Sequence, residues 1–161
     1  MTLRSELGMR RGFDDLPHEA LLNIYYTASQ TRKRAGEFFR MHGLTDVQFN
    51  VLSLLKLQSG EERGLTQVEL SRMMLVNRAN ITTLIDRMEK SDLVVRRSVP
   101  DDRRYNVIEL TPHGLAMWSR VAEVYKEKVR HLMGPLTEEE LKSLVTILQK
   151  VRNNLNGGDV D

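Results

Sequence analysis

Apolar residues recur every three or four positions along most of this chain, which is the spacing of a helix with one buried face. The first long stripe runs from Pro17 to His42, and Gly43 follows where a glycine commonly ends a helix. Residues 1–15 have no sustained period and are expected to form a loose arm. The pattern predicts helices over residues 17–42, 45–58, 66–74, 77–91, 112–133 and 137–155.

The starts of these helices carry a local signal. In several of them a threonine stands at N-cap and a Glu or Gln follows three residues later, so each side chain can bond the other residue's backbone N–H. Asn77 is another good N-cap, and Thr111 precedes Pro112, whose missing N–H costs nothing in a first turn. The capping pairs are Thr45 with Gln48, Thr66 with Glu69, and Thr137 with Glu140.

Residues 93–110 depart from the helical pattern. Two stretches rich in β-branched residues, 93–95 and 107–110, lie on either side of a turn-forming stretch at 99–102 that contains Pro100. This arrangement predicts a β-hairpin.

The helices over 66–74 and 77–91 are joined by only one or two residues, and so short a joint forces a steep crossing, as in a helix-turn-helix. The second helix is apolar on one narrow face (Ile81, Leu84, Ile85 and Met88) and polar on the other. Outward Asn, Arg and Thr side chains suit the major groove, because they can contact adenine, guanine and the thymine methyl group. The predicted DNA-contacting residues of this helix are Asn77, Arg78, Ala79, Asn80, Thr82, Thr83 and Arg87.

A polar solvent face explains that helix alone equally well, but the hairpin after it favours DNA binding. Its turn is expected to carry Asp102, Arg103 and Arg104 at an exposed tip. A narrow minor groove concentrates negative potential and attracts an inserted arginine, and Asp102 could brace the side chain of Arg104. A charged tip that only aids solubility is the alternative, which the preceding helix-turn-helix makes less attractive.

Several short segments match the pattern of a known protein family. They lie at residues 43–45, 48, 51–52, 65–67, 69–70, 81–82, 84–90, 93–94 and 96–97. The most specific piece is Asp-Asp-Arg-Arg at 101–104, ahead of Leu110-Thr111 and Gly114. In these residues the chain resembles the multiple-antibiotic-resistance repressor (MarR) family of bacterial and archaeal regulators, over nearly its full length. Asp92 departs from the family, which usually has Gly there, and this predicts a slightly different helix exit.

The resemblance implies specific roles for the candidate residues. Helix 77–91 would enter the major groove, and Arg104 would enter the minor groove with Asp102 supporting it. Some relatives bind phenolic or aromatic carboxylate effectors, which implies a small aromatic or phenolic effector here. Aromatic residues at helical spacing are more simply interpreted as core, but the candidate pocket residues are Tyr25, Tyr26, Phe39, Phe49 and Trp118.

The last two helices carry more apolar surface than one chain can readily cover. Helix 112–133 is apolar on more than one side, and helix 137–155 has a seam that includes Leu144 and Leu148. We therefore expect a homodimer built from the N-terminal helix and the last two helices, as the resemblance also implies. Packing within a single chain is the alternative.

Composition narrows the function classes. The net charge is only +2, which does not by itself indicate a nucleic-acid partner. The chain has no cysteine, which excludes disulfides and thiolate metal sites, and it has no Gly-rich phosphate loop or hydrolase motif, so no enzyme is expected. It also lacks an export signal or a membrane-length apolar run, so a cytoplasmic protein without membrane contact is predicted.

The histidines leave one metal hypothesis open. Some members of the family that the chain resembles sense zinc through His and carboxylates. His42 and His113 could approach one another here and form part of such a site. Histidines at helix ends are more simply solvent-exposed or capping, and none here has ligand spacing. No metal site and no cofactor is therefore predicted.

Together these inferences predict a mainly α fold with a small β-hairpin wing, a winged helix-turn-helix flanked by long dimerisation helices. The expected parts are an N-terminal arm and dimerisation helix (1–42), a DNA-binding domain (43–110) and C-terminal dimerisation helices (111–161). The predicted function is a transcriptional regulator, expected to be a repressor, that binds double-stranded operator DNA as a homodimer and is released by a small-molecule effector. The alternative is a winged-helix module for protein–protein contact, against which Arg78, Arg87 and Arg104 argue.

Overall fold

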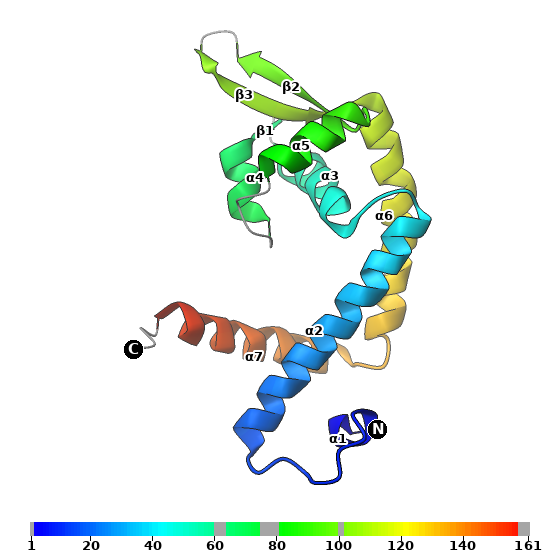
Figure 1. The fold of residues 1–161 in the computed structure, drawn as a ribbon, viewed down its shortest axis with the longest axis vertical. Helices are drawn as coiled ribbons and strands as arrows, with labels where there is room; N and C mark the ends of the chain where they lie inside the picture. Colours follow the sequence, from blue (N-terminus) through cyan, green and yellow to red (C-terminus); the bar gives the residue numbers. More distant parts are fainter. Residues whose placement is uncertain (1, 60–63, 75–80, 100–101, 158–161) are drawn as a thin grey trace. The chain divides into compact units, whose positions relative to one another are not determined.

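The structure is a computed structural model that describes residues 2–59, 64–74, 81–99 and 102–157, with the backbone alone at 99, 102–105 and 156. The chain divides into two compact units, Met1–Leu115 and Ala116–Asp161. The first unit contains helices α1 to α5 and a small sheet, and the second contains most of α6 and all of α7 (Figure 1).

The helices of the first unit follow the predicted order. They are α1 (Leu3–Glu6), α2 (Leu16–Met41), α3 (Asp46–Gln58), α4 (Gln67–Met73) and α5 (Ile81–Lys90). Helix α1 corrects the expectation of a loose arm: Thr2 and Ser5 cap each other, and the side chain of Leu3 is buried. Helix α2 begins one residue before Pro17, because Asp15 is its N-cap and accepts the backbone N–H of His18 at 2.7 Å.

The predicted capping pairs form as expected. Thr45 with Gln48 and Thr66 with Glu69 make reciprocal bonds at the starts of α3 and α4. The backbone N–H and the hydroxyl of Thr66 both donate to the Glu69 carboxylate, and they hold the pKa of that carboxyl below its usual value. These starts depend only on residues three positions apart, which is why the sequence predicts them.

A three-stranded antiparallel sheet has the order β1-β3-β2. Strands β2 (Val94–Val99) and β3 (Asp102–Leu110) confirm the predicted hairpin, with Val94 opposite Leu110. Strand β3 starts at Asp102, so the backbone of residues 102–104 belongs to the strand and not to the turn, which corrects the predicted turn. Strand β1 (Leu65–Thr66) was not expected; it pairs Leu65 with Ile108 across the other edge of β3.

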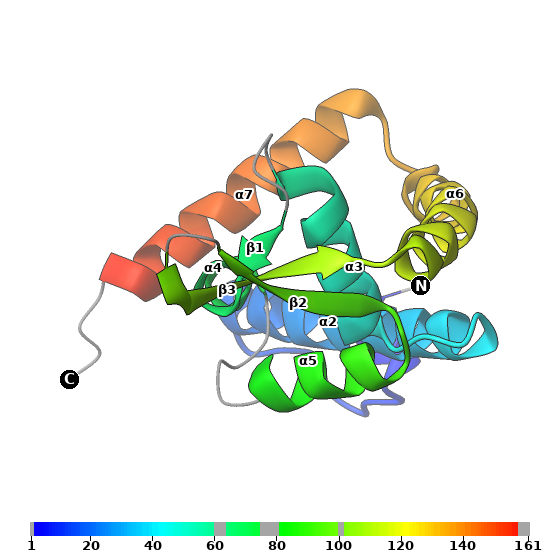
Figure 2. The same cartoon turned by 90° about the horizontal axis from the view of Figure 1, so that it is seen from above.

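The core of the first unit lies between this sheet and the short helices. Helices α3 and α4 contact β3, and α5 contacts β2 (Figure 2). The side chains at the centre are fully buried; they include Leu52, Leu70, Ile85, Met88 and Ile108. Because α4 and α5 share this core with the hairpin, the helix-turn-helix and the wing form one packed unit.

The end of α5 is joined tightly to the start of α6 (Pro112–Met133). Asp92 adopts a left-handed conformation, with φ 54°, which Gly, Asn and Asp adopt more readily than other residues. The hydroxyl of Thr111 donates to the Asp92 carbonyl at 2.5 Å and accepts the N–H of Gly114 at 2.9 Å. A Cβ at Gly114 would lie 1.9 Å from the carbonyl oxygen of Leu93, so this approach requires glycine.

The second unit consists of the rest of α6 and helix α7 (Glu138–Gly157). Thr137 caps α7 as predicted, donating its N–H to Glu140 at 2.8 Å and accepting the N–H of Glu140 at 3.2 Å. Both helices leave large apolar side chains exposed: Val124, Val129 and Leu132 on α6, and Leu144, Val145, Ile147, Val151 and Leu155 on α7. None of the helices in the described ranges is long and apolar enough to cross a bilayer.

Candidate nucleic-acid interface

Helix α5 presents two sharply different faces. Ile85 and Met88 on one face are 0 % exposed, whereas Thr82, Thr83 and Arg87 on the other are exposed. The predicted contacts at Asn77, Arg78, Ala79 and Asn80 lie outside the described residues. What the structure describes is therefore the later part of the predicted reading face, and there the predicted polar residues do point outward.

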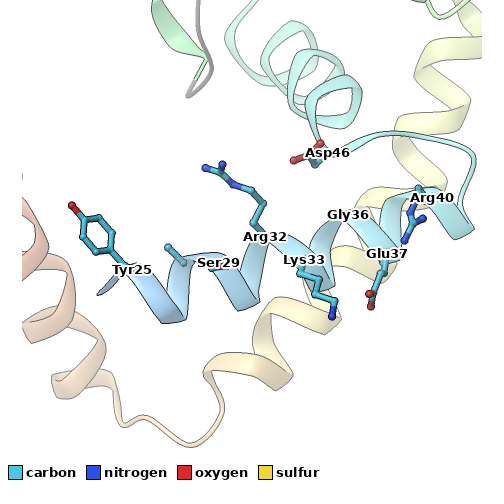
Figure 3. A pocket seen from close by; sticks show the side chains of 9 residues that line it. Tyr25, Ser29, Arg32, Lys33, Gly36, Glu37, Arg40 and Asp46 are labelled. Carbon is cyan, nitrogen blue, oxygen red and sulfur yellow. The ribbon is translucent and has the colours of Figure 1, made fainter. Parts of the chain in front are cut away.

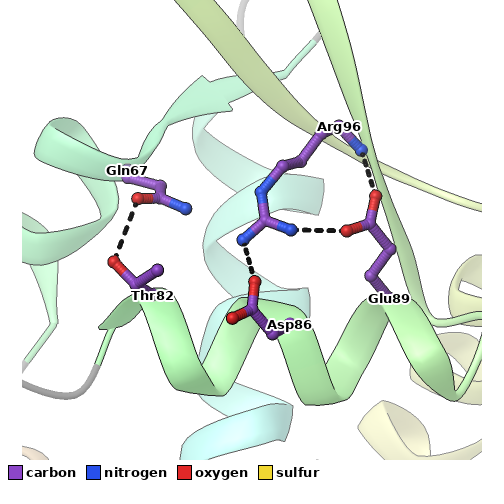
Figure 4. A network of polar contacts seen from close by, with 5 residues as sticks. All are labelled: Gln67, Thr82, Asp86, Glu89 and Arg96. Atoms are coloured by element: carbon purple, nitrogen blue, oxygen red, sulfur yellow. Dashed lines mark hydrogen bonds and ion pairs between the residues drawn. The ribbon is translucent and has the colours of Figure 1, made fainter.

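The start of α5 is connected to the start of α4 by side chains. The hydroxyl of Thr82 donates to Oε1 of Gln67 at 3.4 Å, a long hydrogen bond between the two helices of the helix-turn-helix (Figure 4). Gln67 was not among the predicted site residues, because its partner lies on a different helix.

The wing places the other candidate residues on β3. The backbone of Asp102, Arg103 and Arg104 continues the strand toward the tip of the hairpin, and Asp102 is paired with Val99. A register shift between Ser98 and Val99 marks the irregular end of the ladder. The structure describes only the backbone of these three residues and not their side chains. The minor-groove role of Arg104 therefore stays a prediction.

A charged network links the wing to α5, and the sequence analysis did not identify it. The guanidinium of Arg96, on β2, lies 2.5 Å from Oδ1 of Asp86 and 2.5 Å from Oε2 of Glu89 (Figure 4). The backbone N–H of Arg96 also donates to Oε1 of Glu89 at 3.1 Å. Burial lowers the pKa of Arg96, but the bonds and charges of the two carboxylates outweigh it and raise that pKa.

Part of this network was visible in the sequence. Asp86 and Glu89 are three residues apart and therefore share one face of a helix. A basic residue in the strand that follows is a natural partner for such a pair. Which of the two arginines at 96 and 97 takes the role depends on strand alternation: Arg97 instead reaches Glu109 on β3, with Nε 3.3 Å from Oε2.

A groove of about 700 Å³ lies along α2 and reaches the first residue of α3 (Figure 3). Three cationic side chains and two carboxylates line it, and Arg32 extends from α2 toward the side that carries Asp46. Such a surface suits an anionic or phenolic group beside an aromatic ring. The lining residues are Tyr25, Ala28, Ser29, Arg32, Lys33, Gly36, Glu37, Arg40 and Asp46.

Of the five aromatic residues predicted for a ligand pocket, only Tyr25 lines this groove. Phe39 and Phe49 are buried and stack on each other with ring centroids 4.7 Å apart, which joins α2 to α3. Their role in the structure is core packing, the simpler interpretation of their helical spacing. Tyr26 is half-buried outside the lining set, and Trp118 belongs to the second unit.

The histidine hypothesis gains no support from the described geometry. Nδ1 of His42 lies 2.8 Å from the carbonyl oxygen of Phe38, which is a local contact at a helix end, and His113 is exposed. Within the described parts of the chain, no three His, Asp or Glu side chains come together in a way that could hold a metal ion.

Comparison with known proteins identifies the family. The model of the MarR family matches residues 42–104, the segment that carries the helix-turn-helix and the wing. A regulator of the helix-turn-helix type from Bacillus cereus is 30 % identical over 134 residues, covering 83 % of this chain and 86 % of that protein. The chain belongs to the MarR family.

Solved structures agree with this assignment. AbsC, a MarR family regulator from Streptomyces coelicolor, is 25 % identical, covers 92 % of this chain and 99 % of its own, and has a TM-score of 0.81. The predicted fold class, mainly α with a small wing, is thereby confirmed. The relatives are transcriptional regulators and not enzymes, so this MarR family protein is a DNA-binding transcriptional regulator, as predicted.

Two further neighbours were solved with ligands. A MarR variant from E. coli complexed with operator DNA is 24 % identical, covers 94 % of this chain and 99 % of its own, and has a TM-score of 0.72. The organohalide-sensing regulator RdhR in its 2,4-dichlorophenol bound form is 20 % identical, covers 91 % of this chain and 87 % of its own, and has a TM-score of 0.76.

Proposed function

We propose that this MarR family protein is a repressor that binds a pseudo-palindromic operator as a homodimer and is released by a small aromatic effector. The observation that carries the DNA-binding part is the exposed polar face of α5, which lies opposite the fully buried side chains of Ile85 and Met88. The helix packs against a wing whose strand β3 contains Asp102, Arg103 and Arg104. A helix and a hairpin in this arrangement suit a major groove and the adjacent minor groove. The neighbour that was solved with operator DNA has the same fold.

The direct experiment is to recover the operator. Genomic fragments retained by the protein, after sequencing and motif discovery, should contain a pseudo-palindrome with half-sites about 10 bp apart from centre to centre. Affinity for that site should fall as salt rises, because arginines and lysines displace counterions from phosphates. Retention of no DNA above background, or an affinity that is flat in salt, would indicate a protein–protein interaction module.

Arg104 should be the most sensitive residue of the wing. Arg104→Ala is expected to lose on the order of 1–3 kcal/mol of operator affinity with no change in thermal stability, because it removes a minor-groove contact. Asp102→Ala should lose less, since the cation remains, and Arg103→Ala should weaken all DNA sequences equally if it contacts phosphates. Electrophoretic mobility shifts on operator and scrambled DNA measure both effects. Operator affinity unchanged in Arg104→Ala would contradict the minor-groove role.

The dimeric part of the proposal is supported by the second unit. Exposed apolar side chains on α6 and α7, together with the apolar seam that the sequence places on α7, form more apolar surface than isolated chains usually leave in water. A second copy covering them by two-fold symmetry would present two reading helices to a palindrome.

The effector part is supported by the groove along α2. Its cations, Arg32, Lys33 and Arg40, can pair with a phenolate or carboxylate, and Tyr25 supplies an aromatic wall. The RdhR regulator, a structural neighbour, binds 2,4-dichlorophenol. A set of phenols and aromatic carboxylates should therefore contain compounds that weaken operator binding by roughly tenfold, within the usual range of allosteric coupling.

Arg32→Ala should abolish that response while leaving operator affinity without effector unchanged, because the groove lies on α2 and not on the reading face. Thr31→Ala is the matched control: Thr31 is exposed on the same helix and is not among the lining residues. An equal response to the effector in Arg32→Ala and wild type would locate the effector elsewhere.

A further inference from the structure

We propose that Arg96 positions the wing for DNA binding by clamping β2 to α5 through Asp86 and Glu89. This inference rests on the proposed operator binding. It assigns a role to a residue that does not itself have to touch DNA. We call Arg96, Asp86 and Glu89 the clamp.

The clamp joins β2 to α5 through three hydrogen bonds. One side chain spans two carboxylates on successive turns of α5, with 2.5 Å contacts to each, and the backbone N–H of the same residue adds a third bond to Glu89 at 3.1 Å (Figure 4). The planar guanidinium presents its donors in a rigid fork, so engaging both carboxylates fixes the position of β2 along α5 as well as its distance.

The clamp also affects the charge that α5 carries. Two carboxylates on a helix that reads DNA would repel phosphates unless they are neutralised or directed elsewhere. Arg96 compensates one of the two charges and holds both carboxylates toward the hairpin. The Arg96 side chain is 24 % exposed, so its guanidinium is screened less by solvent than that of Arg97, which is 65 % exposed. The carboxylates that it contacts are 50 % exposed at Asp86 and 37 % exposed at Glu89.

The clamp adds directional contacts to a hairpin that already packs against the helices. The hairpin is already packed against the helices by buried side chains, among them Ile85 on α5 and Ile108 on β3, and this packing sets its general location. Apolar contacts are non-directional, so they restrict the orientation of the hairpin less than two charge-assisted hydrogen bonds from one guanidinium do. A DNA-binding protein that must contact the major and the minor groove at once gains affinity when its helix and wing are fixed before binding. Less conformational entropy is then lost when the protein binds DNA.

The test is a double-mutant cycle between the clamp and the wing tip. Arg96→Met keeps the length of the side chain and removes the fork, and it should weaken binding to the recovered operator by roughly tenfold. In the Arg104→Ala background, Arg96→Met should reduce operator affinity by a factor at least about fivefold smaller than in the wild type. The reason is that a wing without Arg104 contributes little to affinity, so its position matters less. Arg97→Met, the same change one residue along the strand, should be additive with Arg104→Ala.

The salt dependence distinguishes positioning from a lost phosphate contact. Arg96 faces carboxylates and not phosphates, so Arg96→Met should change the slope of log affinity against log salt by much less than 1, whereas losing a phosphate contact reduces that slope by about 1. Arg96→Lys keeps the charge but not the fork and should recover only part of the affinity. If Arg96→Met does not fold, the isosteric variants Asp86→Asn and Glu89→Gln enter the same cycle.

The outcomes are separable. Coupling between the clamp and Arg104, with a salt slope that changes by much less than 1, supports the proposal. Full additivity, or operator affinity equal to wild type, overturns it and leaves operator binding by the wild type intact. A wild type that binds no operator instead refutes the proposed function itself.

Discussion

Gly114→Ala should destabilise the protein more than any other single substitution proposed for it. The added methyl group would lie 1.9 Å from the carbonyl oxygen of Leu93 and 2.8 Å from its carbonyl carbon, and both are backbone atoms. No side chain can rotate away to make room, so the start of α6 must separate from the end of α5. That movement also strains the bonds of Thr111 to Asp92 and Gly114. We expect a loss of about 3 kcal/mol or more.

Thermal unfolding measures this effect, and the transition temperature should fall by about 6–12 °C for a chain of this size. Gly36→Ala is the matched control, because Gly36 lies within α2 and a Cβ there meets nothing within 4 Å. That control should be stabilised slightly, by up to about 1 kcal/mol, since alanine is the better helix former. Equal transition temperatures for Gly114→Ala and wild type would show that the close approach is not tight in solution.

The second large effect is expected on α7. Leu144→Asp combined with Leu148→Asp should convert the proposed dimer to monomers at micromolar concentration. Leu144 is 38 % exposed and Leu148 is half-buried in the single chain, and the two lie one turn apart on the apolar seam. Each carboxylate placed in a dimer interface would be buried without a partner, at about 3–5 kcal/mol. Operator affinity should fall with it, because each monomer would reach only one half-site.

Sedimentation velocity measures the mass, and mobility shifts on the operator measure the affinity. The control is Gln149→Asp combined with Asn153→Asp, which adds two carboxylates at the same spacing on the opposite, polar side of α7. That variant should remain dimeric. A wild-type protein that is monomeric at micromolar concentration would contradict the proposed dimer. A variant with Leu144→Asp and Leu148→Asp that stays dimeric would show that α7 is not part of the interface.

The sequence alone predicted the features that depend on near neighbours along the chain. The capping boxes at Thr45, Thr66 and Thr137 need only residues three positions apart, and each forms as expected. The hairpin and the inward residues Ile85 and Met88 of α5 also follow from local periodicity. Thr2 and Ser5 also cap each other at the start of α1, but Ser5 stands where the capping signature has Glu or Gln, so the sequence does not mark this start.

Only the tertiary structure decided what depends on distant partners. Strand β1 is two residues long and exists because Leu65 meets Ile108 on β3. The sequence allowed Phe39 and Phe49 to be either ligand-pocket residues or core residues. Their stacking on each other between α2 and α3 shows that they are core residues. Arg96 and Arg97 are neighbours of the same type, yet strand alternation sends one to the carboxylates of α5 and the other to Glu109. Spacing along the chain specifies which face a side chain occupies, whereas its partner is specified by the element that packs against that face.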